Sequence, residues 1–135
     1  MCLYTTGKKK KAMEDIICYK VFLLDNGNLR APFRFTLYKT NEIIVDQKKN
    51  FIKYFGNLKQ IYDGFMHSFK TKKTAIYLAD LFNKRGYADR YVVYKCRIPK
   101  NSFYYEGESY IESCKTRKSY ASKRLEVLKE IKSCA

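Results

Sequence analysis

Polar and hydrophobic residues alternate most regularly over residues 91–98, which is the pattern of a strand with one buried face. One face of this strand carries Val92, Tyr94, Cys96 and Ile98. The other face carries the basic residues Lys95 and Arg97. We therefore expect a half-buried strand whose apolar face packs against a helix.

Other strands are predicted before this one and directly after it. Residues 16–24 are β-branched, aromatic and apolar, and the following Asn26-Gly27 pair is typical of a hairpin turn. The return strand is expected over 29–38, with Pro32 marking an edge or a bulge. Shorter extended segments are expected over 42–45, 65–69 and 103–111.

Helical spacing is clearest after Thr71, which is a good N-cap residue. The apolar side of this helix consists of Ala75, Leu78, Ala79, Leu81 and Phe82. The basic residues and Gly86 that follow predict its end. We expect Leu78, Leu81 and Phe82 to face the apolar side of strand 91–98.

Two further segments have spacing that is near-helical. Ser119 or Ser122 can cap a C-terminal helix that contains Leu125, Leu128 and Ile131. Over 47–62, the residues Phe51, Phe55, Leu58 and Tyr62 are spaced as on a helix, but Gly56 interrupts them. We interpret 47–62 as mixed loop and helix.

The order of these segments predicts an α+β fold with a mainly antiparallel sheet, a central helix and a C-terminal helix. At 135 residues and 46% hydrophobic, the chain fits a single small domain. Residues 1–12 contain four adjacent lysines, and such a run of like charges resists packing. We expect a basic, mobile arm over 1–12 and one α+β domain over 13–135.

The cysteines indicate a reduced, intracellular protein, because five are widely spaced without a C-x-x-C pair. With His67 as the single histidine, the chain lacks the paired ligand spacing of structural zinc sites, so no metal is expected. No apolar run approaches the roughly 18 residues of a membrane span. We expect a cytoplasmic protein that has no cofactor and does not bind membranes.

Net charge is the feature that points to function: it is +15, combined with 13 Tyr and 9 Phe. A charge of this size favours a polyanionic partner, above all nucleic acid. Carboxylates are absent between Asp46 and Asp63 and between Glu112 and Glu126, and lysines there alternate with aromatic residues. This pattern suits single strands, whose phosphates bind lysine and whose bases stack on rings. The residues expected to contact nucleic acid are Lys8, Lys9, Lys10, Lys11, Lys48, Lys49, Lys53, Lys115, Arg117, Lys118, Lys123 and Arg124.

Several short motifs resemble small uncharacterised proteins of bacteriophages and mobile elements of gut Bacteroidales, and the resemblance covers most of the chain. The motifs are Met1-Cys2-Leu3-Tyr4, Asp15-Ile16-Ile17-Cys18-Tyr19-Lys20-Val21, Asp63-Gly64-Phe65-Met66-His67-Ser68-Phe69, Cys96-Arg97-Ile98-Pro99-Lys100, Tyr104-Tyr105-Glu106-Gly107 and Ser119-Tyr120-Ala121-Ser122. Asn101 stands where the group's pattern has Gly. The resemblance implies a phage-type origin and action inside an infected bacterium, and it implies no activity.

Two other functions stay open at this point. A small basic protein can bind an acidic host protein and modulate it, in host takeover or in counteracting the host's defences. The Glu106-Gly107-Glu108 motif resembles the Glu-x-Glu turn of arginine-specific ADP-ribosyltransferases, in which Arg30 or Arg34 would supply the strand arginine. Ser68-Phe69 matches the serine-containing element of that family poorly. A non-enzymatic nucleic-acid-binding protein is therefore the favoured hypothesis.

Overall fold

The computed structural model describes residues 2–32, 37–85, 90–112 and 115–132. Of these residues, 58% lie in strands and 11% are helical, and the strand ladders are antiparallel. The predicted α+β class with two helices is therefore wrong, because the described residues form a mainly antiparallel β-sheet with a single helix. Within the same ranges, no helix is long and apolar enough to cross a membrane.

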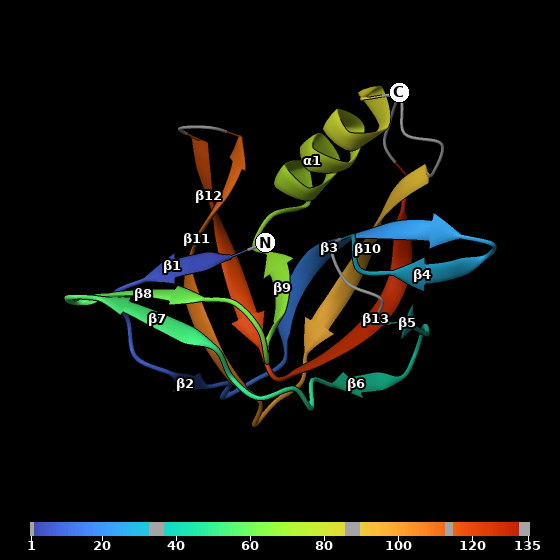
Figure 1. Cartoon of the computed structure of the whole chain (residues 1–135). Helices are drawn as coiled ribbons and strands as arrows, with labels where there is room; N and C mark the ends of the chain where they lie inside the picture. The colour runs from blue at the N-terminus through green and yellow to red at the C-terminus, as the bar shows by residue number, and fades with distance from the viewer. Residues whose placement is uncertain (1, 33–36, 86–89, 113–114, 133–135) are drawn as a thin grey trace.

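The strands form one highly twisted sheet with the order β6-β13-β10-β3-β9-β12-β11-β1-β8-β7 (Figure 1). In chain order the elements are β1 (Leu3–Thr5), β2 (Lys10–Lys11), β3 (Ile16–Asp25), β4 (Asn28–Arg30), β5 (Leu37–Tyr38), β6 (Ile43–Val45), β7 (Ile52–Phe55), β8 (Leu58–Ile61), β9 (Met66–Phe69), α1 (Lys72–Lys84), β10 (Arg90–Ile98), β11 (Phe103–Glu112), β12 (Lys115–Ser122) and β13 (Arg124–Ile131). Off this path, β2 pairs with β11, and β4 pairs with β3 and β5.

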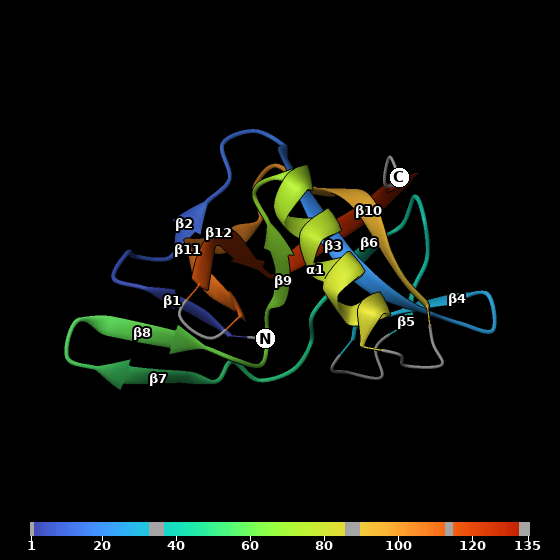
Figure 2. The same ribbon diagram turned by 90° about the horizontal axis from the view of Figure 1, so that it is seen from above.

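The sheet divides where β3 and β9 diverge, because these two strands pair at only one described position, Tyr19 with Phe69. We call β6-β13-β10-β3 with β4 and β5 the β10 lobe, and β9-β12-β11-β1-β8-β7 with β2 the β11 lobe. Helix α1 lies across one face near the junction and contacts β10, β3 and β9 (Figures 1 and 2). Its buried Ala75, Leu78 and Ala79 pack with Val21 and Phe69.

Several predicted elements are confirmed. Helix α1 begins after Thr71, whose hydroxyl accepts a hydrogen bond from the Thr74 amide at 3.3 Å. Strands β3 and β4 form the predicted hairpin, in which Asn26 and Gly27 have φ of 50° and 80°. The return strand is shorter than predicted, because β4 and β5 occupy only its ends and residues 33–36 lie outside the described ranges.

The prediction of which face of β10 packs against α1 is wrong. Val92, Cys96 and Ile98 belong to a core on the face away from α1, together with Phe22 and Leu125. Tyr91 and Val93 of the other face pack with the helix instead. The reason is that the twisted sheet encloses its larger core on the side that α1 does not cover. Arg97, on the other face, forms ion pairs with Glu126 and Asp15.

The predicted C-terminal helix is replaced by β12 and β13. Leu125 and Val127 are fully buried on one face of β13, while Glu126 between them pairs with Arg97. The ladder with β10 shifts between Lys95 and Cys96 and passes over Leu128. Helical spacing of leucines therefore misled the prediction, because burial at every second residue outweighs the helix propensity of Leu, Glu and Lys.

Residues 52–61 form a β-hairpin, not the mixed loop and helix that was predicted. Strands β7 and β8 pair over four positions, from Ile52 with Ile61 to Phe55 with Leu58. Gly56 has φ of 61° at the turn, a conformation that glycine adopts without strain. The two strands form the outer end of the β11 lobe.

The N-terminal segment also differs from the expected mobile arm. Strand β1 lies between β11 and β8, and its Leu3 is fully buried. The Thr5 hydroxyl donates to the carbonyl oxygen of Glu106 at 2.7 Å. Lys10 and Lys11 pair with β11 through their backbones while their side chains stay exposed. Backbone pairing therefore tolerates a run of lysines whose ammonium groups all reach solvent.

Candidate nucleic-acid interface

A groove of about 400 Å³ lies between the first half of α1 and the β11–β12 hairpin. Its lining residues are Thr71, Lys73, Thr74, Tyr77, Ile111, Lys115, Arg117 and Lys118. We call it the basic groove. Its position follows from the fold, because β12 extends beyond the end of β9, and the helix that continues from β9 packs on Ile111.

The described lining of the basic groove is cationic. Lys73, Lys115, Arg117 and Lys118 line it and are exposed, and its described lining residues include no carboxylate. The first turn of α1 contains no acidic residue, so the positive end of the helix dipole adds to these charges. Tyr77 is 42% exposed, and the Lys115 ammonium lies 6.0 Å from the centre of its ring. This arrangement suits an extended anion that carries several negative charges.

The residues predicted from the sequence occupy several places in the structure. Lys115, Arg117 and Lys118 are brought together in the basic groove. Lys48 and Lys49 precede β7, Lys53 lies on it, and all three are exposed. Lys8 to Lys11 lie at β2, on another edge of the same lobe; Lys9 packs 4.7 Å from the Phe103 ring centre, and Lys10 lies 3.6 Å from Glu106.

Lys123 and Arg124 are held by other parts of the chain. The Lys123 ammonium donates to Asn50 Oδ1 at 2.6 Å and to the carbonyl oxygens of Asp46 and Gly64. Arg124 donates to the Ser102 hydroxyl and to the Lys100 carbonyl oxygen. These two side chains therefore join loops of the fold and lie apart from the lining of the basic groove.

We expect Lys123→Met to lower the free energy of unfolding by about 2 kcal/mol, because hydrogen bonds from a charged donor contribute about 1.5 to 3 kcal/mol. Methionine keeps the aliphatic stem and removes only the ammonium. Urea titration measures the loss, and Lys118→Met, in an exposed position, is the matched control. Equal stability of the two variants would show that Lys123 does not join these loops.

Sequence reasoning missed Lys73 and Tyr77 as members of the site. The sequence did contain a signal for Lys73. Thr71 caps a helix whose first turn holds Lys72 and Lys73, although the helix dipole favours acidic residues at that end. The position of Tyr77 opposite β12 depends on how α1 packs across the sheet, and no local pattern contains this information.

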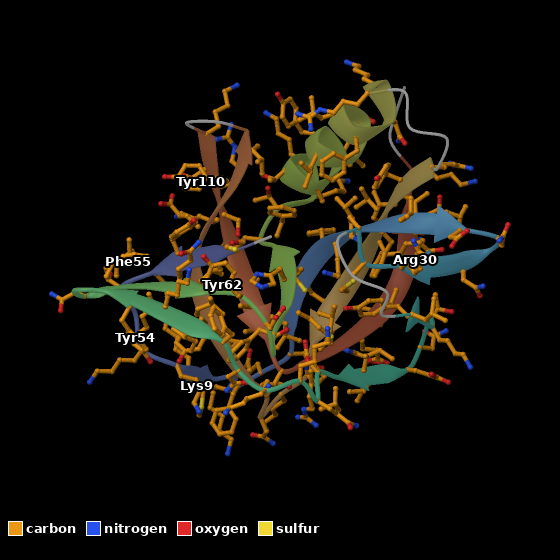
Figure 3. All side chains as sticks on the ribbon, viewed as in Figure 1. Lys9, Arg30, Tyr54, Phe55, Tyr62 and Tyr110 are labelled. Carbon is orange, nitrogen blue, oxygen red and sulfur yellow. The ribbon has the colours of Figure 1, made fainter. Side chains whose placement is uncertain are left out.

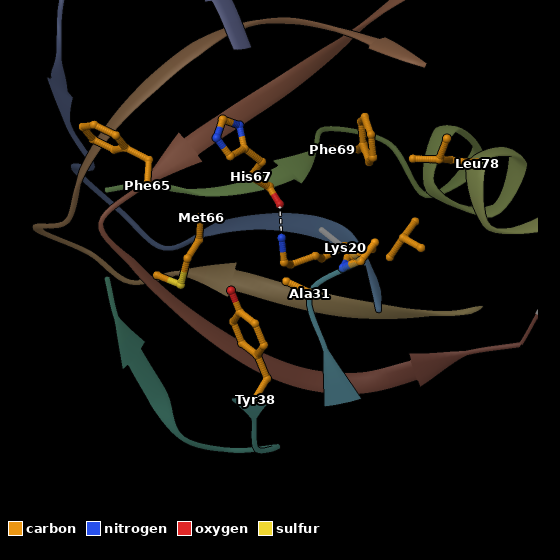
Figure 4. Close-up of a pocket in the computed structure, with 10 residues that line it drawn as sticks. Lys20, Ala31, Tyr38, Phe65, Met66, His67, Phe69 and Leu78 are labelled. Carbon is orange, nitrogen blue, oxygen red and sulfur yellow. Dashed lines mark hydrogen bonds between the residues drawn. The ribbon is translucent and has the colours of Figure 1, made fainter. Parts of the chain in front are cut away.

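A second, smaller pocket of about 50 Å³ lies at the seam between the lobes (Figure 4). The buried Lys20 donates to the His67 carbonyl oxygen at 2.6 Å, and its ammonium lies 5.8 Å from the Tyr38 ring centre. The pocket has room for a few water molecules at most. The lysine therefore joins β3 to β9 where their ladder ends, and the pocket is too small for a substrate.

The described residues do not assemble the predicted transferase site. Ala121 is paired with both His67 and Tyr105, so His67 and Tyr105 share a sheet face. Glu106 and Glu108 point to the opposite face, and both lie inside β11, not in a turn. Lys10 and Lys70 pair with Glu106. Arg30 pairs with Asp25, and Arg34 lies outside the described ranges.

Of the three described cysteines, Cys2 is half-buried, and Cys18 and Cys96 have the character of buried structural thiols. Cys18 and Cys96 are opposite each other on β3 and β10, and both are fully buried. Burial raises the pKa of Cys18 to about 12 and that of Cys96 well above its ordinary value, so both stay protonated. Cys114 and Cys134 lie outside the described ranges. Among the residues described, no three His, Cys, Asp or Glu side chains gather as a metal site requires.

Comparison of the chain with protein families, with curated proteins and with solved structures finds no match. The functional argument therefore depends on the geometry of the basic groove and of the sheet faces around it. Neither of the two pockets described above contains a catalytic pair of side chains. The feature with a clear chemical preference is the concentration of cations between α1 and β12.

Proposed function

We propose that this protein binds single-stranded nucleic acid without sequence specificity and without catalysing a reaction. The observation that carries the proposal is the basic groove, in which four cationic side chains from two elements line one cavity with no carboxylate among its described lining residues. A phosphodiester backbone presents repeated negative charges, which a lining of this kind attracts. The net charge of +15 supports a partner of this kind.

The side chains of the basic groove match a phosphate backbone in their chemistry. Lys73, Lys115 and Lys118 provide point charges, and the Arg117 guanidinium provides a planar fork of donors. Each phosphate that they neutralise releases condensed counterions into solution, which is the main source of non-specific affinity. Lysine and arginine contacts to phosphates do not distinguish one base from another. The expected binding is therefore sequence-independent.

Affinity for a single-stranded oligonucleotide should decrease steeply with salt. With about five phosphates neutralised, the log–log slope is near −3.5, so affinity decreases about a hundredfold between about 50 and 200 mM salt. The variant Lys73→Gln, Lys115→Gln, Arg117→Gln, Lys118→Gln should flatten the slope by about 0.7 for each phosphate that is no longer neutralised. Fluorescence anisotropy with a labelled oligonucleotide measures both. Binding at physiological salt is expected to be micromolar or weaker.

A matched control removes the same number of exposed charges from other parts of the molecule. Replacing Lys39, Lys84, Lys129 and Lys132 with Gln should change the slope much less, and neither variant should lose stability, because exposed charges contribute little to it. No binding at low salt, or binding that does not respond to salt, would contradict the proposal. A host protein that is retained in stoichiometric amount at high salt would support the alternative of a protein partner.

A further inference from the structure

A row of aromatic side chains crosses the outer face of the β11 lobe, which is the face opposite α1. Leu3 and Thr5 of β1 point into the core, so Tyr4 between them points outward. Ile111 packs with the helix, so the preceding Tyr110 also points outward. The rings of Tyr4 and Tyr110 are 5.4 Å apart, edge to face. Figure 3 shows Tyr110, Phe55 and Tyr62 in this lobe.

The row continues onto the β7–β8 hairpin. Gln60 is opposite Tyr4 in the ladder and donates to its hydroxyl at 2.8 Å. Tyr62 lies two residues beyond Gln60 and therefore shares its face, and its ring centre is 5.4 Å from that of Phe51. Phe55 lies at the end of β7 on the same face. We call Tyr4, Phe51, Phe55, Tyr62 and Tyr110 the aromatic face.

The aromatic face is accessible, and lysines adjoin it at the β7–β8 hairpin. Phe51, Phe55 and Tyr110 are 49%, 57% and 53% exposed. The Lys53 ammonium lies 5.6 Å from the Tyr62 ring centre, so a cation is in contact with the row. The sequence from Gln47 to Tyr62, which includes the hairpin, contains Lys48, Lys49, Lys53 and Lys59 and no carboxylate. An apolar surface built for burial against a second apolar surface would not carry these charges.

The aromatic face and the basic groove meet at Lys118. This residue lines the groove and lies opposite Glu108 in the β11–β12 ladder, two residues before Tyr110. Glu108 in turn lies opposite Tyr4, so one carboxylate separates the lysine from that ring. A strand whose phosphates occupy the groove thus has rings within reach on the adjoining face. Neighbouring strands of a sheet are about 4.8 Å apart, so the rings on β11 and β1, together with those at the two ends of β7 and directly after β8, form a stepped surface that suits unpaired bases.

We infer that the aromatic face stacks the unpaired bases of the nucleic acid whose backbone the basic groove binds, an inference that rests on the function proposed above. Flat rings accept any base, because every base has a π-face. A duplex keeps its bases stacked inside, so this surface selects single strands over duplexes. The sheet order ends at β7, so a second copy of the chain could in principle add its own β7 there. The lysines of the two hairpins would then repel each other, which disfavours such a dimer.

An abasic oligonucleotide tests the inference, because it has the charge of an oligothymidine of equal length but no bases. The wild-type protein should bind oligothymidine at least tenfold more tightly than the abasic strand at the same salt. The variant Phe51→Leu, Phe55→Leu, Tyr110→Leu, which removes the three most exposed rings of the aromatic face, should lose most of this preference while its affinity for the abasic strand stays that of the wild type. The groove variant should lose affinity for both strands. Circular dichroism checks that each variant is folded.

A second measurement needs no variant. An oligonucleotide that contains 2-aminopurine changes its fluorescence when the base stacks on a ring, and wild-type protein should produce this change. Equal affinity of the wild type for the two strands, without a fluorescence change, would overturn the inference and leave the proposed function intact. Binding of neither strand would overturn the proposed function. Self-association that the triple variant abolishes would show that the rings serve a contact between copies of the chain, and would overturn the inference as well.

Discussion

Gly107→Ala is expected to lower the free energy of unfolding by about 3 kcal/mol, at the upper end of the cost of overpacking. A Cβ at this position would lie 2.8 Å from Leu3 Cδ2 and 2.9 Å from Thr5 Cβ, and still closer to the Tyr4 carbonyl oxygen. That carbonyl belongs to the backbone of β1 and cannot rotate away. The substitution therefore separates β1 from β11, and thermal or urea unfolding measures the effect.

Gly7→Ala is the control for this prediction. A Cβ at Gly7 would meet only the Thr5 hydroxyl oxygen at 3.2 Å, which belongs to a side chain that can adjust. Hydrogen exchange adds a local readout, because β7 and β8 connect to the rest of the sheet through β1. Their amides should exchange faster in Gly107→Ala than in Gly7→Ala. If Gly107→Ala is as stable as the wild type, β1 does not lie against β11 as described.

Stability should decrease strongly as the pH rises from 9 toward 12. Burial raises the pKa of the Cys18 thiol from 9.0 to about 12 and that of the Tyr120 phenol from 10.0 to about 12. The folded protein holds these protons while the unfolded chain releases them. The stability that each group contributes is complete below its unfolded pKa and is lost as the pH passes through the folded one. A shift of one pKa unit corresponds to about 1.4 kcal/mol, so Cys18 alone accounts for a loss of up to about 4 kcal/mol in the free energy of unfolding.

Urea titrations in a reducing buffer at several pH values between about 8 and 11 test this prediction. Cys18→Ala is the informative comparison, because it removes one linked proton and leaves the lysines unchanged. Its unfolding free energy should decrease less with pH than that of the wild type. Parallel pH profiles for the two proteins would show that Cys18 is not buried in the folded state.

The parts of the fold that could be predicted have a local physical signal. The Asn26-Gly27 turn fixes the β3–β4 hairpin, Thr71 begins α1, and alternation over 91–98 identifies β10. Which face of β10 meets α1 depends on the curvature of the whole sheet. The alternation of polar and apolar residues shows that a strand has two faces. It does not show which face packs against α1 and which packs in the core on the other side of the sheet.

The segments that were predicted wrongly have ambiguous spacing. Phe51, Phe55, Leu58 and Tyr62 repeat at helical intervals, yet Phe51 and Tyr62 meet across a hairpin that turns at Gly56. A glycine followed by Asn57 between two short apolar runs is a hairpin signal, and it is more specific than the helical count. Near the C-terminus, leucine spacing suggested a helix because the bulge at Leu128 disrupts the alternation of β13.

For the candidate site, the sequence identified cationic residues but not how the fold distributes them. Lys115, Arg117 and Lys118 were grouped because no carboxylate separates them, and they do share the basic groove. Lys123 and Arg124 belong to the same run, but the end of β12 turns their side chains toward loops that accept their hydrogen bonds. Charge along a chain does not reveal which cations already have protein acceptors.

The position of β1 has a consequence for how the chain reaches this fold. Strand β1 lies between β8 and β11, and its contact with β11 joins Tyr4 to Glu108. Such pairs of high sequence separation carry a large loop-closure cost and slow folding. During translation at about 5 to 20 residues per second, β1 must wait on the order of five to twenty seconds for β11 to be synthesised. Strand β1 therefore reaches its final position between two strands only after most of the sheet has been made.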